Sequence, residues 1–206
     1  MTEQLGIRTQ VTVPLHFADG YAVDAQVFTF TGLGDGKEHI ALGLGDHRGA
    51  AVPLVRAHSE CMTGDVFGSA RCDCGPQLRE AVQRIAERGG YLLYLRQEGR
   101  GIGLYAKLDA YALQDTGLDT YAANRALGFA DDERDYTAAA RMLTALGVSR
   151  IDLLTNNPDK PSQLREHGVE VAEVVPTDVH AVPDNLRYLL AKVTHTHHTI
   201  ALPIAA

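Results

Sequence analysis

The sequence predicts a mixed α/β fold, in which an antiparallel β portion at the N-terminus is followed by alternating helices and strands. The first observation is that apolar and polar residues alternate through much of residues 7–30, a period typical of half-buried strands. The second is that apolar residues recur at helical spacing from Pro76 onward, between short apolar runs of strand length. The third is that no linker divides the chain, so we expect residues 1–206 to form one compact domain, with 1–57 mainly β, 58–192 an α/β portion carrying a candidate metal site, and 193–206 a tail.

The N-terminal quarter is expected to contain four strands. The apolar side chains of Val11, Val13, Leu15 and Phe17 fall on one face, and Ala18-Asp19-Gly20 supplies a turn before alternation resumes, which indicates a hairpin. Glycine-rich segments mark the later turns. The predicted strands are 7–17, 21–30, 40–44 and 52–55.

A long helix is expected to begin near Pro76, because proline is tolerated in the first turn of a helix. Its apolar stripe ends at Gly89-Gly90, where glycine is a common helix terminator. A buried strand at 91–95 then leads into the polar loop 96–101. The stripe consists of Leu78, Ala81, Val82, Ile85 and Ala86.

Four helices and two strands should follow this loop. The first helix is expected to bury Leu104, Leu108, Tyr111 and Ala112 and to end near Gly117. A short helix should follow Asp119-Thr120, either of which can act as N-cap. The remaining predictions are a helix that carries Ala139, Met142, Leu143 and Leu146 and ends at Gly147, strands at 151–154 and 169–175, and a short helix at 162–167.

Composition and charge exclude several classes of function. The net charge of -7 and the lack of a basic stripe argue against a nucleic-acid partner. No apolar run has the length of a membrane span, and the first residues lack the pattern of a signal peptide. We therefore expect a cytoplasmic protein without a membrane partner, in a reducing compartment that keeps thiols free.

All three cysteines fall in one short segment, as Cys61, Cys72 and Cys74. An odd number with this close spacing suits disulfides poorly. Thiolates suit zinc, and a set of three protein ligands leaves a coordination position for water, as in catalytic zinc sites. The alternative is three buried, inert thiols. Histidines at 195, 197 and 198 are expected to be incidental.

Other polar clusters allow two interpretations each. The loop 96–100 carries two arginines around a glycine, which suits bidentate binding of phosphate, but it also fits a solvated charged turn. The standard phosphate-binding and dinucleotide-binding motifs are absent. Residues 132–134 fit a surface salt bridge, and 155–158 fit either a simple turn or polar groups presented to a purine.

Five segments together resemble the GTP cyclohydrolase II family, in order and at the family's spacing. The match covers most of the chain. The segments are 55–65 (VRAHSECMTGD), 71–78 (RCDCGPQL), 96–104 (RQEGRGIGL), 110–115 (AYALQD) and 153–158 (LLTNNP).

The resemblance implies an enzyme that opens the imidazole ring of GTP. That family releases formate and pyrophosphate and forms 2,5-diamino-6-ribosylamino-4(3H)-pyrimidinone 5′-phosphate, the first step of riboflavin biosynthesis. It implies Zn²⁺ on Cys61, Cys72 and Cys74, Mg²⁺ with the triphosphate, and a homodimer.

The resemblance also implies roles for single residues. Asp132 matches the family's proton acceptor, Arg134 the arginine assigned to attack at the α-phosphate, and Tyr111 the active-site tyrosine. Because guanidinium is almost never deprotonated, stabilisation of charge is the role we expect for Arg134. The residues implied to bind GTP are Arg56, Ala57, His58, Ser59, Glu60, Gln77, Glu98, Gly99, Arg100, Thr120, Thr155 and Lys160.

The chain also departs from the family pattern. Asp109 stands where the family has arginine, Ala122 lies where an acid is usual, Val174 replaces an arginine, and the segment after Lys192 lacks the usual ending. Two alternatives therefore stay open: a paralogue that stops at the formamide or serves a specialised pathway, and a non-catalytic zinc-containing nucleotide-binding module. The second is disfavoured because a binding module needs none of the three catalytic residues.

Overall fold

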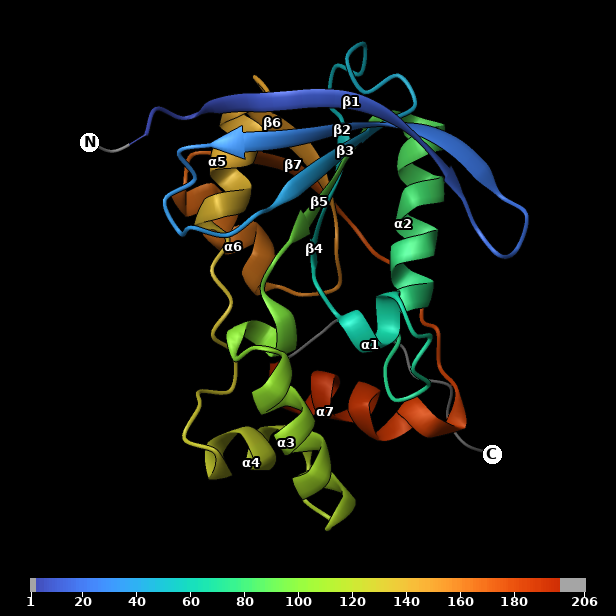
Figure 1. The fold of residues 1–206 in the computed structure, drawn as a ribbon, viewed down its shortest axis with the longest axis vertical. Helices are drawn as coiled ribbons and strands as arrows, with labels where there is room; N and C mark the ends of the chain where they lie inside the picture. The colour runs from blue at the N-terminus through green and yellow to red at the C-terminus, as the bar shows by residue number, and fades with distance from the viewer. Residues whose placement is uncertain (1–2, 197–206) are drawn as a thin grey trace.

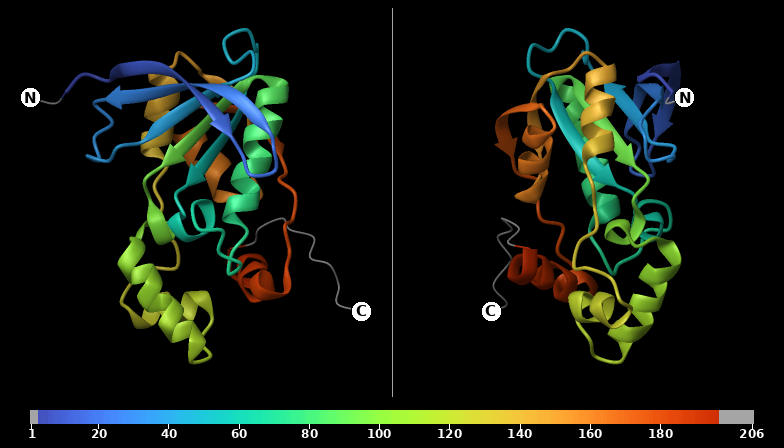
Figure 2. Two further views of the ribbon diagram at one scale, coloured as in Figure 1. Left: turned by 45° about the vertical axis from the view of Figure 1, so that its right-hand side comes forward. Right: turned by 90° about the vertical axis from the view of Figure 1, so that its left-hand side faces the viewer.

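The computed structural model describes residues 3–196, which form a seven-stranded mixed sheet with helices on both faces (Figures 1 and 2). The strand order is β1-β2-β3-β5-β4-β6-β7. The strands are β1 (Gly6–His16), β2 (Ala22–Thr31), β3 (Ile40–Leu44), β4 (Leu54–Ser59), β5 (Gly90–Leu95), β6 (Arg150–Leu154) and β7 (Glu170–Val175).

The sheet has an antiparallel half and a parallel half. β1, β2, β3 and β5 pair antiparallel, with Val11 opposite Val27 in the first hairpin. β5, β4, β6 and β7 pair parallel. The predicted mixed α/β class and the N-terminal antiparallel portion are confirmed.

Helices cover the two faces of the sheet and gather at one end of it. They are α1 (Met62–Asp65), α2 (Cys74–Arg88), η1 (Glu98–Gly101), α3 (Leu104–Asp115), α4 (Thr120–Ala126), α5 (Thr137–Ala145), α6 (Asp159–Glu166), η2 (Pro183–Asn185) and α7 (Leu186–Thr196).

The central strand β4 is buried on both faces, so two hydrophobic cores flank it. Val55 packs in the core that contains Met142 of α5, and Leu54 packs in the core that contains Ile85 of α2. Parallel strands end at the same edge of a sheet, and loops at this edge commonly carry the functional groups. At that edge, α1, α3, α4 and α7 gather below the ends of β4 and β5 (Figure 1).

Several boundaries differ from those expected. β4 continues through Ser59 instead of ending at Val55, because it pairs with β5 in parallel as far as Ser59. α2 begins at Cys74, ahead of Pro76, and α6 begins at Asp159 instead of Ser162. Asp119 is the residue that caps α4, since its side chain accepts hydrogen bonds from the backbone amides of Tyr121 and Ala122.

The predicted apolar face of α3 is wrong at two of its four residues, whereas Leu104 and Tyr111 are half-buried. Leu108 is 43% exposed and Ala112 is exposed, whereas Lys107 and Ala110 are buried. The inner face of α3 meets polar groups at the end of the sheet, so it buries a lysine that was not on the predicted face. Neither α1 nor α7 was predicted, and α7 extends into the predicted tail.

His197 and His198 lie outside the described residues. None of the described helices has the length and apolar character that a membrane span requires.

Candidate active site

One pocket at the end of β4, β5 and β6 collects nearly every residue singled out in the sequence. The exceptions are Ala57, which is buried in β4, and Asp132, which lies behind Arg134. The predicted residues that line it are Arg56, His58, Ser59, Glu60, Cys61, Cys72, Cys74, Gln77, Glu98, Gly99, Arg100, Tyr111, Thr120, Arg134, Thr155 and Lys160.

The three cysteines converge on one wall of this pocket. Their sulfur atoms all lie within 4.8 Å of one another, and the Cys61 and Cys72 sulfurs are 3.7 Å apart. A Cβ on Gly64 would lie 2.8 Å from the Cys72 Sγ and 3.1 Å from the Cys61 Sγ, so glycine is needed for the three thiols to meet. Three thiols with this convergence fit a metal site, and the donor set suits zinc.

The thiols share their protons unequally in the metal-free protein. Hydrogen bonds from Cys72 and Cys74, together with Lys107, hold the pKa of Cys61 far below its usual range. The hydrogen bond to Cys61 raises the pKa of Cys72 to about 11, and the pKa of Cys74 is also raised. Cys61 is therefore the thiol most readily deprotonated, and binding of a metal requires the thiolate form of its ligands.

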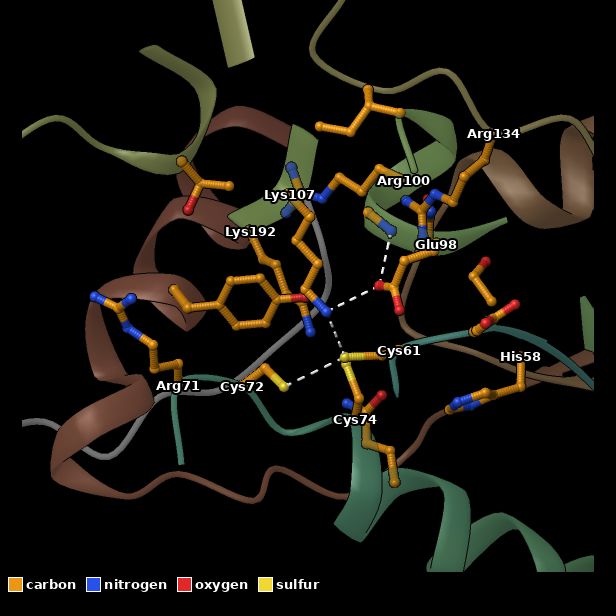
Figure 3. Close-up of a pocket in the computed structure, with 18 of the residues that line it drawn as sticks. His58, Cys61, Arg71, Cys72, Cys74, Glu98, Arg100, Lys107, Arg134 and Lys192 are labelled. Carbon is orange, nitrogen blue, oxygen red and sulfur yellow. Dashed lines mark hydrogen bonds and ion pairs between the residues drawn. The ribbon is translucent and has the colours of Figure 1, made fainter. Parts of the chain in front are cut away.

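A buried lysine joins the cysteine wall to the loop after β5 (Figure 3). Lys107 Nζ donates to Cys61 Sγ at 3.1 Å, Thr63 Oγ1 at 2.9 Å and Glu98 Oε1 at 2.8 Å. Glu98 also accepts from the backbone amides of Met62 at 2.6 Å and Gly99 at 2.9 Å. Both carboxylate oxygens of Glu98 are thus engaged by donors of the chain.

His58 and Asp65 connect the cysteines to the cationic part of the pocket. His58 Nε2 lies 3.1 Å from Asp65 Oδ2, which also accepts from the backbone amide of Cys61 at 3.0 Å and the Tyr94 hydroxyl at 2.9 Å. Burial lowers the pKa of His58, which favours the neutral imidazole. With Arg56 Nε donating to Nδ1 at 3.5 Å, the ring donates from Nε2 to Asp65.

Buried cations form the opposite part of the site. Arg56, 5% exposed, donates from Nη2 to Gln77 Oε1 at 2.7 Å, and Lys160, 6% exposed, donates to the carbonyl of Ala57 at 2.7 Å. Burial and the charges of Arg56 and Arg134 hold the pKa of Lys160 well below its ordinary value. Since a buried positive cluster is costly without a counterion, this region suits an anion.

Arg134 differs from these cations because it is paired with the carboxylate of Asp132. Its Nε donates to Asp132 Oδ1 at 2.8 Å, and its Nη2 donates to Oδ2. Burial opposes ionisation of both groups, but their mutual attraction is stronger than this effect. The pKa of Asp132 is therefore lowered. The pKa of Arg134 is raised, with a further contribution from Tyr136. Both groups are therefore charged at neutral pH.

Comparison with known proteins identifies the family. The family model for GTP cyclohydrolase II matches residues 9–176. The chain belongs to the GTP cyclohydrolase II family. This confirms the resemblance seen in the sequence and the expected class of enzyme.

Relatives within the GTP cyclohydrolase II family match along almost the whole chain. The GTP cyclohydrolase-2 of Vibrio cholerae is 55% identical over 181 residues, which cover 87% of this chain and 91% of that protein. The GTP cyclohydrolase-2 of Psychromonas ingrahamii is 49% identical over 198 residues, 96% of this chain and 98% of that protein. The riboflavin biosynthesis protein RibBA of Bacillus subtilis is 50% identical over 192 residues, which cover 92% of this chain and 47% of that protein.

Three single-residue departures from the GTP cyclohydrolase II pattern lie away from the pocket lining. Asp109 is exposed on α3, Ala122 is half-buried in α4, and Val174 is 44% exposed on β7.

Within the loop after β6, Asn156 donates to the carbonyl of Thr177 at 3.0 Å, and the Asn157 amide donates to Thr155 Oγ1 at 3.0 Å. This loop is therefore a braced turn that still faces the pocket.

Among the pocket and supporting residues that were given no role in the sequence analysis are Asp65, Lys107, Tyr188 and Lys192. Lys107 had a usable signal, because it stands three residues after Leu104 and four before Tyr111 on a predicted helix. Tyr188 and Lys192 had none, since no helix was predicted around them.

Proposed function

We propose that the protein hydrolyses GTP to formate, pyrophosphate and the diaminopyrimidine 5′-phosphate of the family reaction. The observation that carries the proposal is that one pocket holds both the converging thiols of Cys61, Cys72 and Cys74 and the buried cations Arg56 and Lys160. Ring opening at C8 needs an activated water, and pyrophosphate release needs positive charge at the phosphates. The two requirements match the two parts of the pocket.

The cysteines are the proposed zinc ligands. When bound there, zinc would supply Lewis-acid activation of water for hydrolysis at C8 of guanine. His58 and Asp65 hold the backbone and the orientation of this wall, and Lys107 holds the Cys61 sulfur. The proposed Mg²⁺ would arrive with the triphosphate, because Mg²⁺ is commonly held through substrate phosphates and few carboxylates.

The cations are the proposed triphosphate ligands. Arg56 and Lys160 would bind phosphate oxygens, and Arg134 would stabilise the charge that develops at the α-phosphate. Asp132 fixes the orientation of the Arg134 fork and is the proposed proton acceptor. The lowered pKa of Asp132 makes it a weak base, so positioning of Arg134 is the role best supported by geometry.

Tyr111 is the proposed residue for the second hydrolysis, which releases formate. Burial raises the pKa of its phenol, so the hydroxyl stays protonated and can donate a hydrogen bond that positions the water or the opened ring. The guanidinium of Arg71 lies over the ring at 4.7 Å and helps to hold it.

The remaining GTP contacts are proposed as the resemblance implies. Ala57 would act only through its carbonyl, which holds Lys160. Glu60 faces the pocket from an ion pair with Arg96 at 2.5 Å. A homodimer in the cytoplasm that binds neither nucleic acid nor membrane completes the proposal. The other residues proposed to contact GTP are His58, Ser59, Gln77, Glu98, Gly99, Arg100, Thr120 and Thr155.

Product identification tests the proposal. The zinc-loaded protein is incubated with GTP and Mg²⁺, and formate, pyrophosphate and the pyrimidine are measured by mass spectrometry and enzymatic assay. Equal amounts of all three are expected. A formamide product without formate would instead identify the paralogue, and bound but unchanged GTP would identify a binding module.

A matched pair of variants ties the activity to the pocket. Arg134→Gln removes a buried arginine paired with Asp132, and Arg125→Gln removes an exposed arginine paired with Asp131. We expect the first variant to lose most of its turnover and the second to keep it. Equal losses in the two variants would mean that the pocket is not the reaction site.

A further inference from the structure

Arg100 has two features that mark it as a functionally constrained residue. It is the one residue other than glycine with a positive φ, 61°, among residues 3–196. Its Nη1 is buried and finds no acceptor among the described residues. Residues in the left-handed region and buried donors without partners are both uncommon, and both gather where a ligand binds.

Two tyrosine rings hold the guanidinium of Arg100. Its Cζ lies 4.5 Å from the ring centroid of Tyr121 on α4 and 5.8 Å from that of Tyr188 on α7. Both distances are within the range of cation–π attraction. Burial raises the pKa of Tyr188 well above its ordinary value, so its ring is neutral beside the cation.

The same Tyr188 ring also contacts a second cation. Lys192 Nζ lies 4.4 Å from the ring centroid and pairs with the buried carboxylate of Asp73 at 2.7 Å. Asp73 stands between Cys72 and Cys74, so α7 links the cysteine loop to the loop of Arg100. The helix crosses beneath α1 in Figure 1, on the pocket side of the sheet.

The way in which Arg100 is held differs from the way in which Arg134 is held. Asp132 occupies the Nε and Nη2 donors of Arg134, whereas a ring face holds a guanidinium without using any N–H group. Arg100 therefore keeps its buried Nη1 donor for a ligand, because Nη1 has no hydrogen-bond partner among the described residues.

We propose that Tyr188 is a positioning residue that, together with Tyr121, holds the Arg100 guanidinium ready for an oxygen of the GTP triphosphate. The inference rests on the proposed function, because it assumes that the anion in this pocket is the triphosphate. It adds α7 to the substrate site, as an element that acts through Arg100.

The test compares Tyr188→Leu, which removes the ring, with Tyr188→Phe, which keeps it. The ligands are guanosine and a GTP analogue whose α–β bridging oxygen is replaced by methylene, measured by calorimetry on the zinc-loaded protein. We expect Tyr188→Leu to weaken binding of the analogue about 2- to 30-fold, the range of a partly to fully desolvated cation–π contact. Binding of guanosine should not change, and Tyr188→Phe should bind both ligands as the native protein does.

Leu189→Ala is the control for packing of the helix. Leu189 is fully buried on α7 and does not line the pocket, so its truncation should lower the thermal midpoint but leave the affinity for the analogue unchanged. If Leu189→Ala weakens binding of the analogue as much as Tyr188→Leu does, the ring only packs the helix and the proposal is overturned.

A double variant separates this inference from the proposed function. If Tyr188 acts through Arg100, adding Tyr188→Leu to Arg100→Gln should cause no further loss of affinity for the analogue. If the affinity losses of the two single variants add fully in the double variant, the positioning role of Tyr188 is overturned and Arg100 remains a ligand. Unchanged affinity in Arg100→Gln alone would instead overturn the phosphate contact of Arg100, and the inference with it.

Discussion

Replacing Lys107 by methionine should strongly destabilise the protein. Lys107 and Glu98 form an ion pair with side chains only 10% and 7% exposed. Methionine removes the ammonium and leaves the Glu98 carboxylate buried with two backbone amides as its donors. Removing one partner of a buried pair costs about 3–5 kcal/mol, and since two donors remain we expect about 3 kcal/mol. That is a large part of the roughly 5–15 kcal/mol by which a domain is stable.

Urea unfolding followed by circular dichroism measures this loss. Zinc concentration must be fixed, because bound metal stabilises the folded state. Lys37→Met, at an exposed lysine, is the matched control and should change the free energy of unfolding by less than about 0.5 kcal/mol. The double variant Lys107→Met with Glu98→Gln should recover part of the loss, because it removes the unpaired charge. A Lys107→Met protein as stable as the native one would refute the reasoning.

Three further predictions concern the chemistry and the pH dependence of the site. Cys72→Ser should lose zinc, measured by atomic absorption, together with formate release; stoichiometric zinc in an active variant would contradict the ligand set. Tyr111→Phe should keep the fold, the zinc and pyrophosphate release but accumulate a formamide intermediate, whereas a normal formate yield without that intermediate on mass spectrometry would remove the residue from the second step. The pKa of Asp132 is lowered from 3.8, so its pair with Arg134 stabilises the fold above about pH 4 and loses this effect as the pH falls through the lower, folded-state value. The stability difference between native and Asp132→Asn protein, both metal-free, should therefore shrink in urea titrations below pH 3.8; a constant difference from pH 7 to pH 3 would speak against it.

Local sequence patterns indicated the strands and α2 because alternation, short apolar runs and helical spacing are visible along the chain. The strand at 40–44 was predicted with the bounds that the structure has. Periodicity failed at α3, where the buried face carries Lys107 because it meets a polar site. Periodicity assumes that the inner face of a helix is apolar, and this assumption fails where a helix lines a site.

The site was predicted unevenly for a related physical reason. Cys61, Cys72 and Cys74 are close in sequence and carry their chemistry in the residue type, so a metal site could be inferred without the fold. The roles of Tyr188 and Lys192 depend on what their side chains meet across the pocket. Such tertiary contacts between a ring and a cation leave no local pattern to recognise.

The two parts of the pocket should differ in when they can form along the folding pathway. The cysteine wall needs only the short segment from Cys61 to Cys74 to close on itself. The cationic part needs Arg56 of β4 to meet Lys160, which follows β6, and those two strands pair in parallel only after a long loop has closed. Because closure of longer loops costs more entropy and slows folding, the thiols can meet a metal before the phosphate-binding cations are assembled. Metal captured at that stage would hold the start of α2 in place while the later strands join the sheet.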